Sequence, residues 1–440
     1  MKKRNRYAKA STARRWSGTG MARKRKQVIA ALVCLVLCAF AGIAAFRGMA
    51  KTEKKTIVLP TPTPTEAPSD PEGKEAELAS PYRMYTERYT TDLSPDNTWM
   101  EDFDDTRIKR NVKGIYLTAD VLNKKLDEIL AFADSTGINA VVIDFKGDDG
   151  SLTAKVTSRL LREKGSTDRT TLNDLSGSLA KFKAHNIYCI ARIVCFRDNR
   201  TVSRTPSYGV RLADGTAMKD KNGYTWLNPF LPEVWEFLTE VGREAAKMGF
   251  DEINFDYCGF PTDAGAKNGR YGRDLTRENK EEAVTGFLKY ACENLKPLGV
   301  FVSADVGGTI INSDTDASAA GQNYAELCLY LDYICPMVYP SSYSNGYYSL
   351  KIPDAQPYEL VLHAMKDSKQ ALSLNMAKGR CAEVRPWLQA FTATWLKGHI
   401  EYGSKALGEQ IRATYDAGYS GWLLWNQNGA YEVFRDALGR

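Results

Sequence analysis

The sequence predicts a (β/α)8 TIM barrel over residues 111–440, preceded by one transmembrane helix and a Pro/Thr-rich stalk. Three observations lead there. Eight short β-rich runs alternate with amphipathic helical stretches, an apolar run occupies residues 28–46, and a segment in which Pro alternates with Thr follows it. Alternating strands and helices predict a parallel sheet with crossover helices, and a count of eight favours a closed barrel over a doubly wound sheet.

Residues 1–27 are predicted to form a basic cytoplasmic arm. They hold eleven of the 59 Lys and Arg residues and none of the 53 Asp and Glu residues. The rest of the chain is therefore mildly acidic, which argues against a nucleic-acid partner. Its composition, 43% hydrophobic and 25% charged, excludes a wholly disordered or collagen-like chain.

The apolar run from Val28 to Phe46 is long enough to cross a membrane as a helix. Because the basic arm abuts its N-terminal side, we expect a single-pass cell-membrane anchor with the N-terminus cytoplasmic and the C-terminal domain extracellular. A cleaved signal peptide is the alternative interpretation, since small residues at 44–45 and 48–50 resemble a cleavage site.

Residues 47–80 are predicted to be a linker and residues 81–110 a short transition segment. Prolines alternate with other residues from Pro60 to Pro68, which keeps the chain extended and unable to pack. Such a spacer lifts a domain off the membrane and suits a partner in the cell wall or the extracellular matrix.

The barrel elements are predicted from local patterns. The expected strands are 114–118, 140–146, 187–196, 252–257, 301–306, 332–339, 371–374 and 421–425. The expected helices are 121–135, 172–185, 232–248, 276–295 and 404–417. No phosphate-binding glycine loop follows any of these strands, so we predict no nucleotide cofactor.

The cysteines and histidines do not form a metal-binding pattern. Seven cysteines lie outside the anchor without CxxC spacing, and the three histidines are in unrelated contexts. We expect these cysteines to be free thiols that pack as small apolar residues, and no zinc site. No metal and no cofactor is predicted, although Asp148, Asp149 and Asp263 are oxygen ligands that could hold Ca²⁺.

Candidate catalytic residues lie where apolar strands end, since barrels of this kind place the active site at the carboxyl ends of their strands. The two-residue period of a strand puts three polar pairs on one face each: Asp144 with Lys146, Asn254 with Asp256, and Ser303 with Asp305. Glycoside hydrolysis needs two carboxyl groups flanking an anomeric carbon. Each Asp could instead be a loop cap or a salt-bridge partner, and Lys146 could neutralise Asp144.

Aromatic residues crowd the same strand ends and loops, where they could stack on sugar faces or fill the core. They are Trp226, Tyr257, Phe260, Tyr339, Tyr343, Trp387, Trp422 and Trp425. For Trp387 and Trp422 we favour the core.

A set of sequence blocks resembles a known family. The blocks are 113–118 (KGIYLT), 142–146 (VIDFK), 190–194 (IARIV), 226–229 (WLNP), 251–257 (DEINFDY), 260–261 (FP), 303–306 (SADV), 336–340 (PMVYP), 385–389 (RPWLQ) and 425–426 (WN). In this order they resemble the putative glycosyl hydrolase domain family, bacterial barrel proteins related to the α-amylase-like hydrolases. The resemblance implies that Asp256 is the nucleophile and that Asp305 occupies the acid/base position.

The sequence departs from its relatives at two positions. The α-amylase relatives usually carry Glu where this chain has Asp305, and the family block Tyr-Pro-Ser-His-Tyr has Ser342 in place of His. The loss of that His removes a hydrogen-bond donor to the transition state. A chitinase-like interpretation fails because the Glu of its strand-four motif is here Cys258.

The leading hypothesis is a membrane-anchored extracellular glycoside hydrolase that cleaves a cell-surface or environmental polysaccharide with Asp256 as nucleophile and Asp305 as proton donor. The expected substrate-binding residues are Asp144, Lys146, Arg192, Trp226, Asn254, Tyr257, Tyr339, Trp425 and Asn426. The competing hypothesis is a non-catalytic glycan-binding barrel in cell-wall or spore-envelope assembly, suggested by Ser342 and by the stalk. A third is a scaffold that recruits partners through its basic arm, although such an arm is more simply an orientation signal attracted to anionic lipid.

Overall fold

The computed structural model describes residues 105–439 apart from 166, 168 and 169. The predicted arm, anchor and linker, and the transition segment up to residue 104, lie outside the described residues. Within the described ranges, no helix combines the length and the apolar character needed to cross a membrane.

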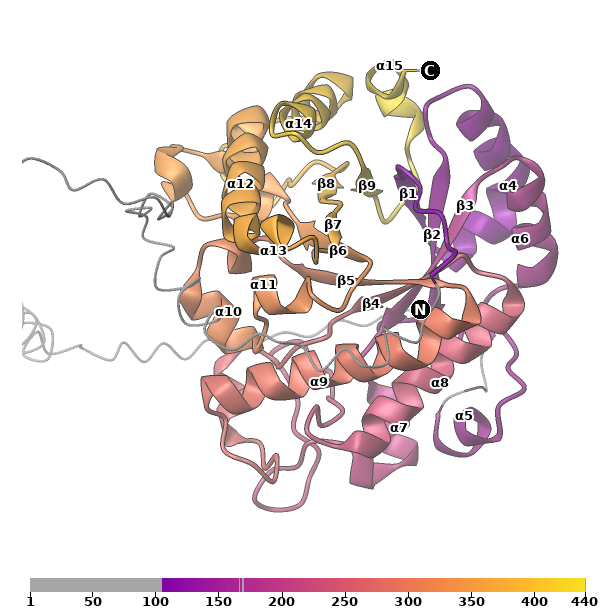
Figure 1. The fold of residues 1–440 in the computed structure, drawn as a ribbon, viewed down its shortest axis with the longest axis vertical. Coiled ribbons are helices and arrows are strands. Elements are labelled where there is room, and N and C mark those ends of the chain that lie inside the picture. The colour runs from indigo at the N-terminus through magenta and orange to yellow at the C-terminus, as the bar shows by residue number, and fades with distance from the viewer. Residues whose placement is uncertain (1–104, 166, 168–169, 440) are drawn as a thin grey trace, which may run out of the picture. The chain divides into compact units, whose positions relative to one another are not determined.

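The described chain forms a closed parallel barrel with eight strand positions, which confirms the predicted (β/α)8 arrangement (Figure 1). Consecutive strands pair in parallel, and pairing of β9 with β1 and of β5 with β6 closes the ring. The strands are β1 (Lys113–Leu117), β2 (Ala140–Lys146), β3 (Tyr188–Val194), β4 (Glu252–Asp256), β5 (Phe301–Gly307), β6 (Tyr333–Met337), β7 (Glu383–Val384), β8 (Trp387–Gln389) and β9 (Trp422–Trp425).

Two short strands share the seventh position of the barrel. Both β7 and β8 pair with β6, β8 continues to β9, and Arg385 and Pro386 separate the two. The predicted strand at 371–374 was wrong. Its apolar residues Ala371 and Leu372 are buried at the end of a helix, α12, and they pack there as one turn of an amphipathic face rather than as a strand.

Helices surround the strands (Figure 1). They are α4 (Ala119–Asp134), α5 (Arg159–Lys164), α6 (Leu175–Ala184), α7 (Asn199–Arg204), α8 (Pro232–Met248), α9 (Arg277–Leu295), α10 (Asp314–Ala320), α11 (Tyr324–Leu327), α12 (Pro357–Ala371), α13 (Ser373–Ala377), α14 (Ser404–Asp416) and α15 (Arg435–Leu438). The five predicted helices correspond to α4, α6, α8, α9 and α14, with ends displaced by at most a few residues.

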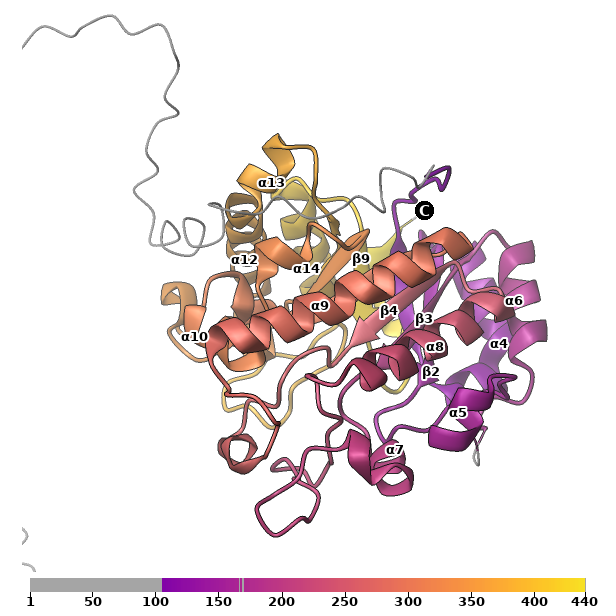
Figure 2. The ribbon, with the colours of Figure 1, turned by 60° about the horizontal axis from the view of Figure 1, so that its bottom comes forward.

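Local sequence signals explain where the long helices begin and end. The side chains of Thr118 and Thr276 accept hydrogen bonds from the first-turn N–H groups of α4 and α9. Pro232 occupies the first turn of α8, and Gly249 ends that helix with φ of 100°, a left-handed conformation that favours glycine. These ends set the length of the crossovers that α8 and α9 make over β3, β4 and β5 (Figure 2).

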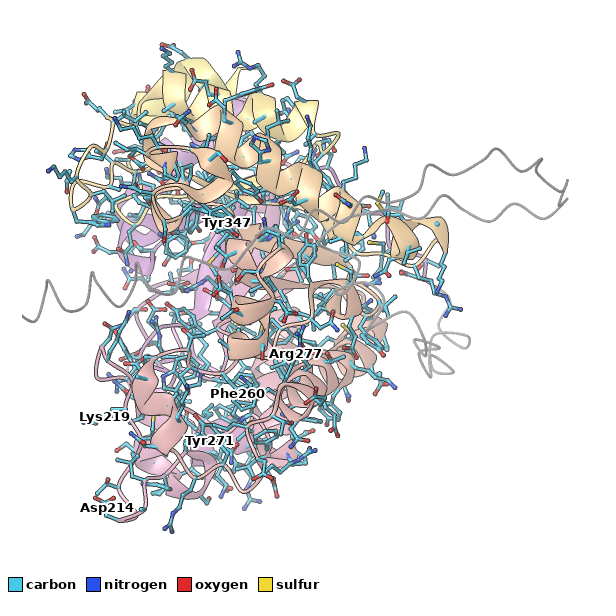
Figure 3. All side chains as sticks on the ribbon, turned by 90° about the vertical axis from the view of Figure 1, so that its left-hand side faces the viewer. Asp214, Lys219, Phe260, Tyr271, Arg277 and Tyr347 are labelled. Carbon is cyan, nitrogen blue, oxygen red and sulfur yellow. The ribbon has the colours of Figure 1, made fainter. Side chains whose placement is uncertain are left out.

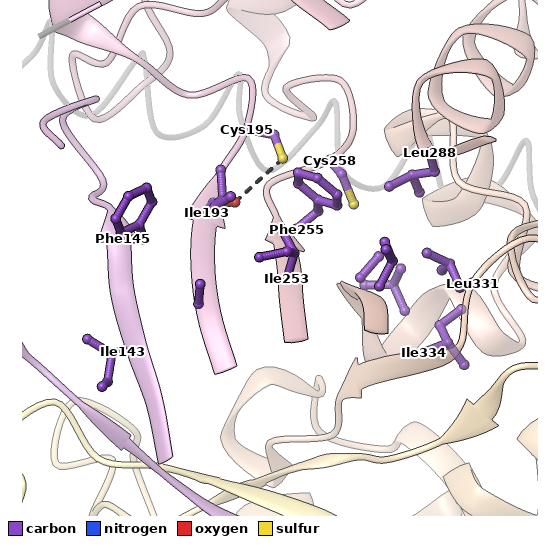
Figure 4. Packing of buried hydrophobic residues seen from close by; sticks show 14 of the residues in the cluster. Ile143, Phe145, Ile193, Cys195, Ile253, Phe255, Cys258, Leu288, Leu331 and Ile334 are labelled. Carbon is purple, nitrogen blue, oxygen red and sulfur yellow. Dashed lines mark hydrogen bonds between the residues drawn. The ribbon is translucent and has the colours of Figure 1, made fainter. Parts of the chain in front are cut away.

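The apolar core lies in two layers, one outside the strands and one inside the barrel. In the outer layer, alternate strand residues such as Ile143, Phe145, Ile253 and Phe255 pack against the helices (Figure 4). The inner layer contains Val112, Tyr116, Ala140, Val142, Tyr188, Ile190, Phe301, Tyr333, Cys335, Trp387 and Leu423. Beyond the inner layer, the polar residues Arg192, Asp256 and Asp305 lie towards the carboxyl ends of β3, β4 and β5.

A buried ion pair lies inside the barrel below those polar residues. Arg385 contacts both carboxylate oxygens of Glu252, one of them at 3.1 Å. The hydroxyls of Tyr188 and Ser303 also donate to Glu252, at 3.1 and 2.5 Å. The pair joins β4 to the connection between β7 and β8, with its charges compensated by each other and by these hydroxyls.

Candidate active site

A cleft of about 980 Å³ opens at the carboxyl ends of the strands. Residues from six of the strands or their ends reach it: Arg192 of β3, Asp256 of β4, Asp305 of β5, Met337 of β6, Trp387 of β8 and Trp425 of β9. The loops after β3 and β4 form one wall. Figure 3 shows Lys219 of the first loop and Phe260 and Tyr271 of the second in the same part of the molecule.

Asp256 is held in place by a guanidinium group and a backbone amide. Arg192 donates to Asp256 Oδ2 from Nε at 2.9 Å and from Nη2 at 2.6 Å, and the Tyr257 N–H donates to Oδ1 at 2.6 Å. Charge-assisted hydrogen bonds of this kind favour the ionised form of a carboxyl group. The carboxyl group of Asp256 is therefore fixed at the edge of the cleft by three hydrogen bonds.

Arg192 connects three carboxylates. Besides Asp256, it contacts Asp144 at 2.7 Å and Asp148 at 3.3 Å. Asp148 also pairs with Arg197 at 2.7 Å. Burial raises the pKa of Asp148, but the two arginines outweigh burial and hold it below its usual value. The three carboxylates and the two arginines thus form one ionic network across the ends of β2, β3 and β4.

Asp305 is in a different environment from Asp256. Its side chain is nearly buried, and Oδ1 accepts hydrogen bonds from Asn254 Nδ2 at 2.9 Å and from Trp387 Nε1 at 2.7 Å. Within the described residues, no hydrogen bond reaches Oδ2, although Asp305 lines the cleft. Burial and the neighbouring charge of Asp256 raise the pKa of Asp305 to about 8, so this carboxyl group is protonated at neutral pH.

The strand register brings the two carboxyl groups to neighbouring positions. Asn254 of β4 pairs with Ser303 of β5, and the Asn254 side chain donates to both Ser303 Oγ and Asp305 Oδ1. Asp256 and Asp305 each follow two residues later on the same face of their strands. The geometry therefore places the arginine-paired carboxyl group of Asp256 beside the buried carboxyl group of Asp305, an arrangement that suits acid and base roles.

The backbone is strained next to Asp256. Tyr257 has φ of 51°, a left-handed conformation that costs free energy in a residue other than glycine. The Arg197 guanidinium lies 3.7 Å from the centroid of the Tyr257 ring, and Trp226 meets that ring edge-on. These contacts hold the strained residue, which supplies both the amide that binds Asp256 and an aromatic wall of the cleft.

Most predicted aromatic residues line the cleft. They are Trp226, Tyr257, Phe260, Tyr339, Trp387 and Trp425. Trp425 stacks on Tyr116, with ring centroids 4.1 Å apart, and Trp226 donates through Nε1 to Asp220 Oδ2 at 3.0 Å. Trp422 is a core residue, as predicted.

Lys146 lies outside the cleft, unlike the expectation from strand alternation. The register between β2 and β3 shifts between Asp144 and Lys146, which reverses the alternation there. Lys146 is fully buried, pairs with Asp198 at 2.8 Å and donates to the Val194 carbonyl at 2.6 Å. Lys146 is therefore not among the residues that line the cleft, and its ammonium group is occupied by these buried partners.

Three other predicted binding residues act behind the cleft surface. Asp144 accepts from Tyr116 Oη at 2.6 Å and from Arg192, and Asn254 orients Asp305. Asn426 donates to the Ala390 carbonyl at 2.6 Å and so ties the end of β9 to that of β8. None of the three is among the residues that line the cleft, so they support it rather than form its surface.

The structure adds four residues to the candidate site: Tyr116, Asp148, Arg197 and Trp387. Trp387 was expected in the core, where it is indeed buried, but its indole N–H also binds Asp305. Asp148 was considered only as a calcium ligand. Tyr116 lies on the inward face of the first strand, so the two-residue alternation of strand side chains could have identified it. Arg197 lies in a long loop, where the sequence shows no such period.

The residues considered for calcium binding are engaged elsewhere. Asp148 pairs with arginines, Asp149 pairs with Arg200 at 2.7 Å, and Asp263 accepts from the Gly265 N–H. In the described part of the chain, no three His, Cys, Asp or Glu residues are grouped as metal ligands. The seven cysteines outside the predicted anchor are free thiols, as expected from their spacing.

Comparisons with known proteins agree with this description of the fold. The model of a family described as "Putative glycosyl hydrolase domain" matches residues 114–431. A search of curated proteins found no match. A hypothetical protein from Ruminiclostridium thermocellum is 34% identical, with a TM-score of 0.39, over 44% of this chain and 97% of its own.

Two further solved structures are similar at low identity. The PgaB (BpsB) glycoside hydrolase domain from Bordetella bronchiseptica has a TM-score of 0.54 and is 14% identical over 75% of this chain and 99% of its own. The spore cortex-lytic enzyme SleL from Bacillus megaterium has a TM-score of 0.43 and is 11% identical over 76% of this chain and 75% of its own. At these identities, the Bordetella domain supports the barrel fold alone.

Proposed function

The chain belongs to the putative glycosyl hydrolase domain family, and from this membership and the cleft we propose that it cleaves a cell-surface or environmental polysaccharide with a two-carboxylate mechanism. Asp256 serves as the nucleophile or base, and Asp305 serves as the proton donor. The contrast between the two carboxyl groups carries the proposal. Arg192 and the Tyr257 amide favour the anion of Asp256, whereas Asp305 keeps its proton at neutral pH.

In this mechanism each group acts in the protonation state that its surroundings favour. Asp305 donates its proton to the glycosidic oxygen as the bond to the leaving sugar breaks. Asp256, on the other side of the anomeric carbon, either attacks that carbon or takes a proton from the attacking water. Asn254 and Trp387 hold the carboxyl group of Asp305 through Oδ1, which leaves Oδ2 facing the cleft for proton transfer.

The aromatic residues of the cleft supply apolar faces for sugar rings. Trp226, Tyr257, Tyr339 and Trp425 are proposed to bind substrate by stacking. Arg192 is a positioning residue that fixes Asp256 and, through Asp144, the end of β2. We also propose that residues 28–46 anchor the protein in the cell membrane and that the barrel is extracellular, on the grounds of the apolar run and the basic arm before it.

Release of new reducing ends from polysaccharides tests the proposal. The full chain in detergent is incubated with purified peptidoglycan, chitin, cellulose and starch, beside the variants Asp256→Asn and Asp214→Asn. Asp214 is exposed in a loop and does not line the cleft, so it provides a matched control. We expect the wild-type protein and Asp214→Asn to cleave at least one glycan and Asp256→Asn to lose that activity. Equal activity of all three would contradict the assignment.

A glycan-binding barrel without catalysis is the second candidate function. It is favoured by Ser342, which is exposed and lies outside the cleft lining where the family block has His, and by the shorter Asp305 at the position where related hydrolases carry Glu. Retention of a wall glycan without any product after long incubation would support this function. Product release that depends on Asp256 would exclude it.

A further inference from the structure

An aromatic row leads out of the cleft over the loop that follows β8. Tyr339 lines the cleft, its ring meets Phe391 edge-on at a centroid distance of 5.9 Å, and Phe391 stacks on Trp395 at 6.0 Å with 21° between the planes. Trp395 is 69% exposed. The three residues belong to two loops at the carboxyl ends of β6 and β8, the end of the barrel where the cleft opens.

The exposure of Trp395 is not explained by folding. A tryptophan side chain gains free energy when its large apolar surface is buried, and exposed tryptophans are often found at binding surfaces. Trp422 and Trp387, on neighbouring strands, are each 1% exposed. The loop instead presents Trp395 outward on the flat face of Phe391, so one face of the stack is left for a ligand.

Buried polar groups hold the row in place. The side-chain amide of Gln389 accepts from the Ser341 N–H at 2.9 Å and donates to the Phe391 carbonyl at 3.1 Å and to Asp354 at 3.0 Å. Gln389 and Asp354 are themselves buried. The loops that carry Tyr339 and Phe391 are thus fixed to each other. Binding of a ligand to this row therefore costs little conformational entropy, because the row is already ordered.

From this row we infer that Tyr339, Phe391 and Trp395 bind further sugar residues of a polysaccharide whose cleaved bond lies between Asp256 and Asp305. The inference rests on the proposed function and adds where the substrate chain continues beyond the cleft, over the loop that follows β8. The row is continuous with the cleft through Tyr339. Phe391 packs between the edge of Tyr339 and the face of Trp395, so it supports the exposed Trp395, whose ring offers an apolar contact to a pyranose ring beyond the cleft. A protein partner seated on Trp395 is the competing occupant and is an outcome of the test.

Affinity electrophoresis measures binding along the row. The full chain, with Asp256→Asn to prevent cleavage, is run through native gels that contain detergent and glycol chitin, hydroxyethyl cellulose or soluble starch. Trp395→Ala and Phe391→Ala are introduced separately into this protein. Leu298→Ala is the matched control, because Leu298 is 52% exposed and lies just before β5, at the opposite end of the barrel. Cleavage of the same three polysaccharides by the wild-type protein is measured in parallel.

We expect at least one polysaccharide to retard the parent protein, and Trp395→Ala and Phe391→Ala to bind it about tenfold more weakly. Leu298→Ala should bind as the parent does. A disaccharide of the same sugar should compete for the cleft equally well in the parent and in Trp395→Ala, because a disaccharide bound in the cleft cannot reach Trp395.

Two results would overturn the inference. One is equal retardation of the parent and Trp395→Ala, and the other is the absence of retardation in all three gels. In either case, cleavage by the wild-type protein would leave the proposed hydrolase function standing, whereas the absence of both binding and cleavage would count against both. If Trp395 instead binds a protein partner, Trp395→Ala should weaken the binding of that protein and leave the retardation in the polysaccharide gels unchanged. That result also overturns the inference.

Discussion

At the scale of single residues, the site depends on two aspartates that differ in their surroundings. Asp256 faces Arg192 and a backbone N–H group, whereas Asp305 is buried beside an indole, an amide and the charge of Asp256. Neighbouring carboxyl groups with such different surroundings can take opposite roles in proton transfer. The pH dependence of cleavage and the effect of replacing Arg192 therefore follow from the surroundings of these two residues.

The rate of glycan cleavage should fall as the pH rises through about 8. Asp305 must carry its proton to act as the acid, and its raised pKa keeps the proton on up to that pH. Above it, kcat/KM should decrease about tenfold for each pH unit. A pH profile of the wild-type protein measures this limb. A rate that is constant from pH 6 to 10 would show that Asp305 does not donate a proton in the rate-limiting step.

Replacing Arg192 by Met should reduce cleavage and move the acidic limb of the same profile to higher pH. Without the guanidinium group, Asp144 and Asp256 lose the cation that they share, whereas Asp148 keeps Arg197, and like charges disfavour ionisation of the base. Arg200→Met is the control, because Arg200 pairs with Asp149 outside the cleft lining. Circular dichroism checks that both variants fold. An unchanged acidic limb in Arg192→Met would refute the positioning role.

Much of the site could be predicted from the two-residue alternation of strands, which places Asn254 with Asp256 and Ser303 with Asp305 on the inner face. Alternation failed for Lys146, because a register irregularity after Asp144 is not visible in the composition of the strand. The roles of Asp148 and Arg197 could not be predicted, since loop residues meet through tertiary contacts alone. The different environments of the two aspartates also required the structure.

At the scale of elements, closure of the barrel depends on a tyrosine beyond the last strand. The hydroxyl of Tyr431 donates to the carbonyls of Tyr116 and Leu424 at 2.8 and 3.2 Å, and it accepts from the N–H groups of Tyr116 and Asn426 at 3.1 and 3.2 Å. These backbone groups belong to β1 and to β9 and its end. One buried hydroxyl thus bridges the first and last strands.

Tyr431→Phe should destabilise the fold by about 1–3 kcal/mol, because it leaves buried backbone groups without a partner. Urea denaturation followed by circular dichroism gives the free energy of unfolding. Tyr358→Phe is the matched control, since its hydroxyl bonds to Asp416 on the surface. Equal stability of the two variants would mean that the bridge contributes little to closure.

The prediction of helices and strands succeeded where the hydrophobic residues of a segment followed one clear period. The predicted span 232–248 coincides with α8, since Pro, an amphipathic face and Gly mark its start, body and end. It failed at the seventh strand. Pro386 divides that strand into β7 and β8, too short to show a period, while the apolar end of α12 resembled a strand.

At the scale of the whole molecule, the described chain enters the barrel at the end opposite the cleft. Arg107 binds both carboxylate oxygens of Asp332 at 3.0 Å and lies over the ring of Phe301, and these two residues stand at the amino ends of β6 and β5. The cleft opens at the other end of the barrel, where the strands have their carboxyl ends.

If residues 28–46 anchor the protein, the full chain should fractionate with membranes, and protease added to intact cells should degrade the barrel. A variant in which Leu32, Val36 and Ile43 are replaced by Asp should lose membrane association, because charged residues oppose insertion. Cell fractionation and immunoblotting measure both. A barrel that resists protease in intact cells but not in lysed cells would contradict an extracellular location.

The most direct test of the proposed catalytic pair compares Asp256→Asn and Asp305→Asn on a polysaccharide that the wild-type protein cleaves and on the aryl glycoside of the same sugar. An activated aryl leaving group departs without a proton, so it needs the nucleophile or base but not the acid. We expect Asp256→Asn to lose both activities and Asp305→Asn to lose cleavage of the polysaccharide while it retains that of the aryl glycoside. Full cleavage of the polysaccharide by either variant would contradict the two-carboxylate mechanism.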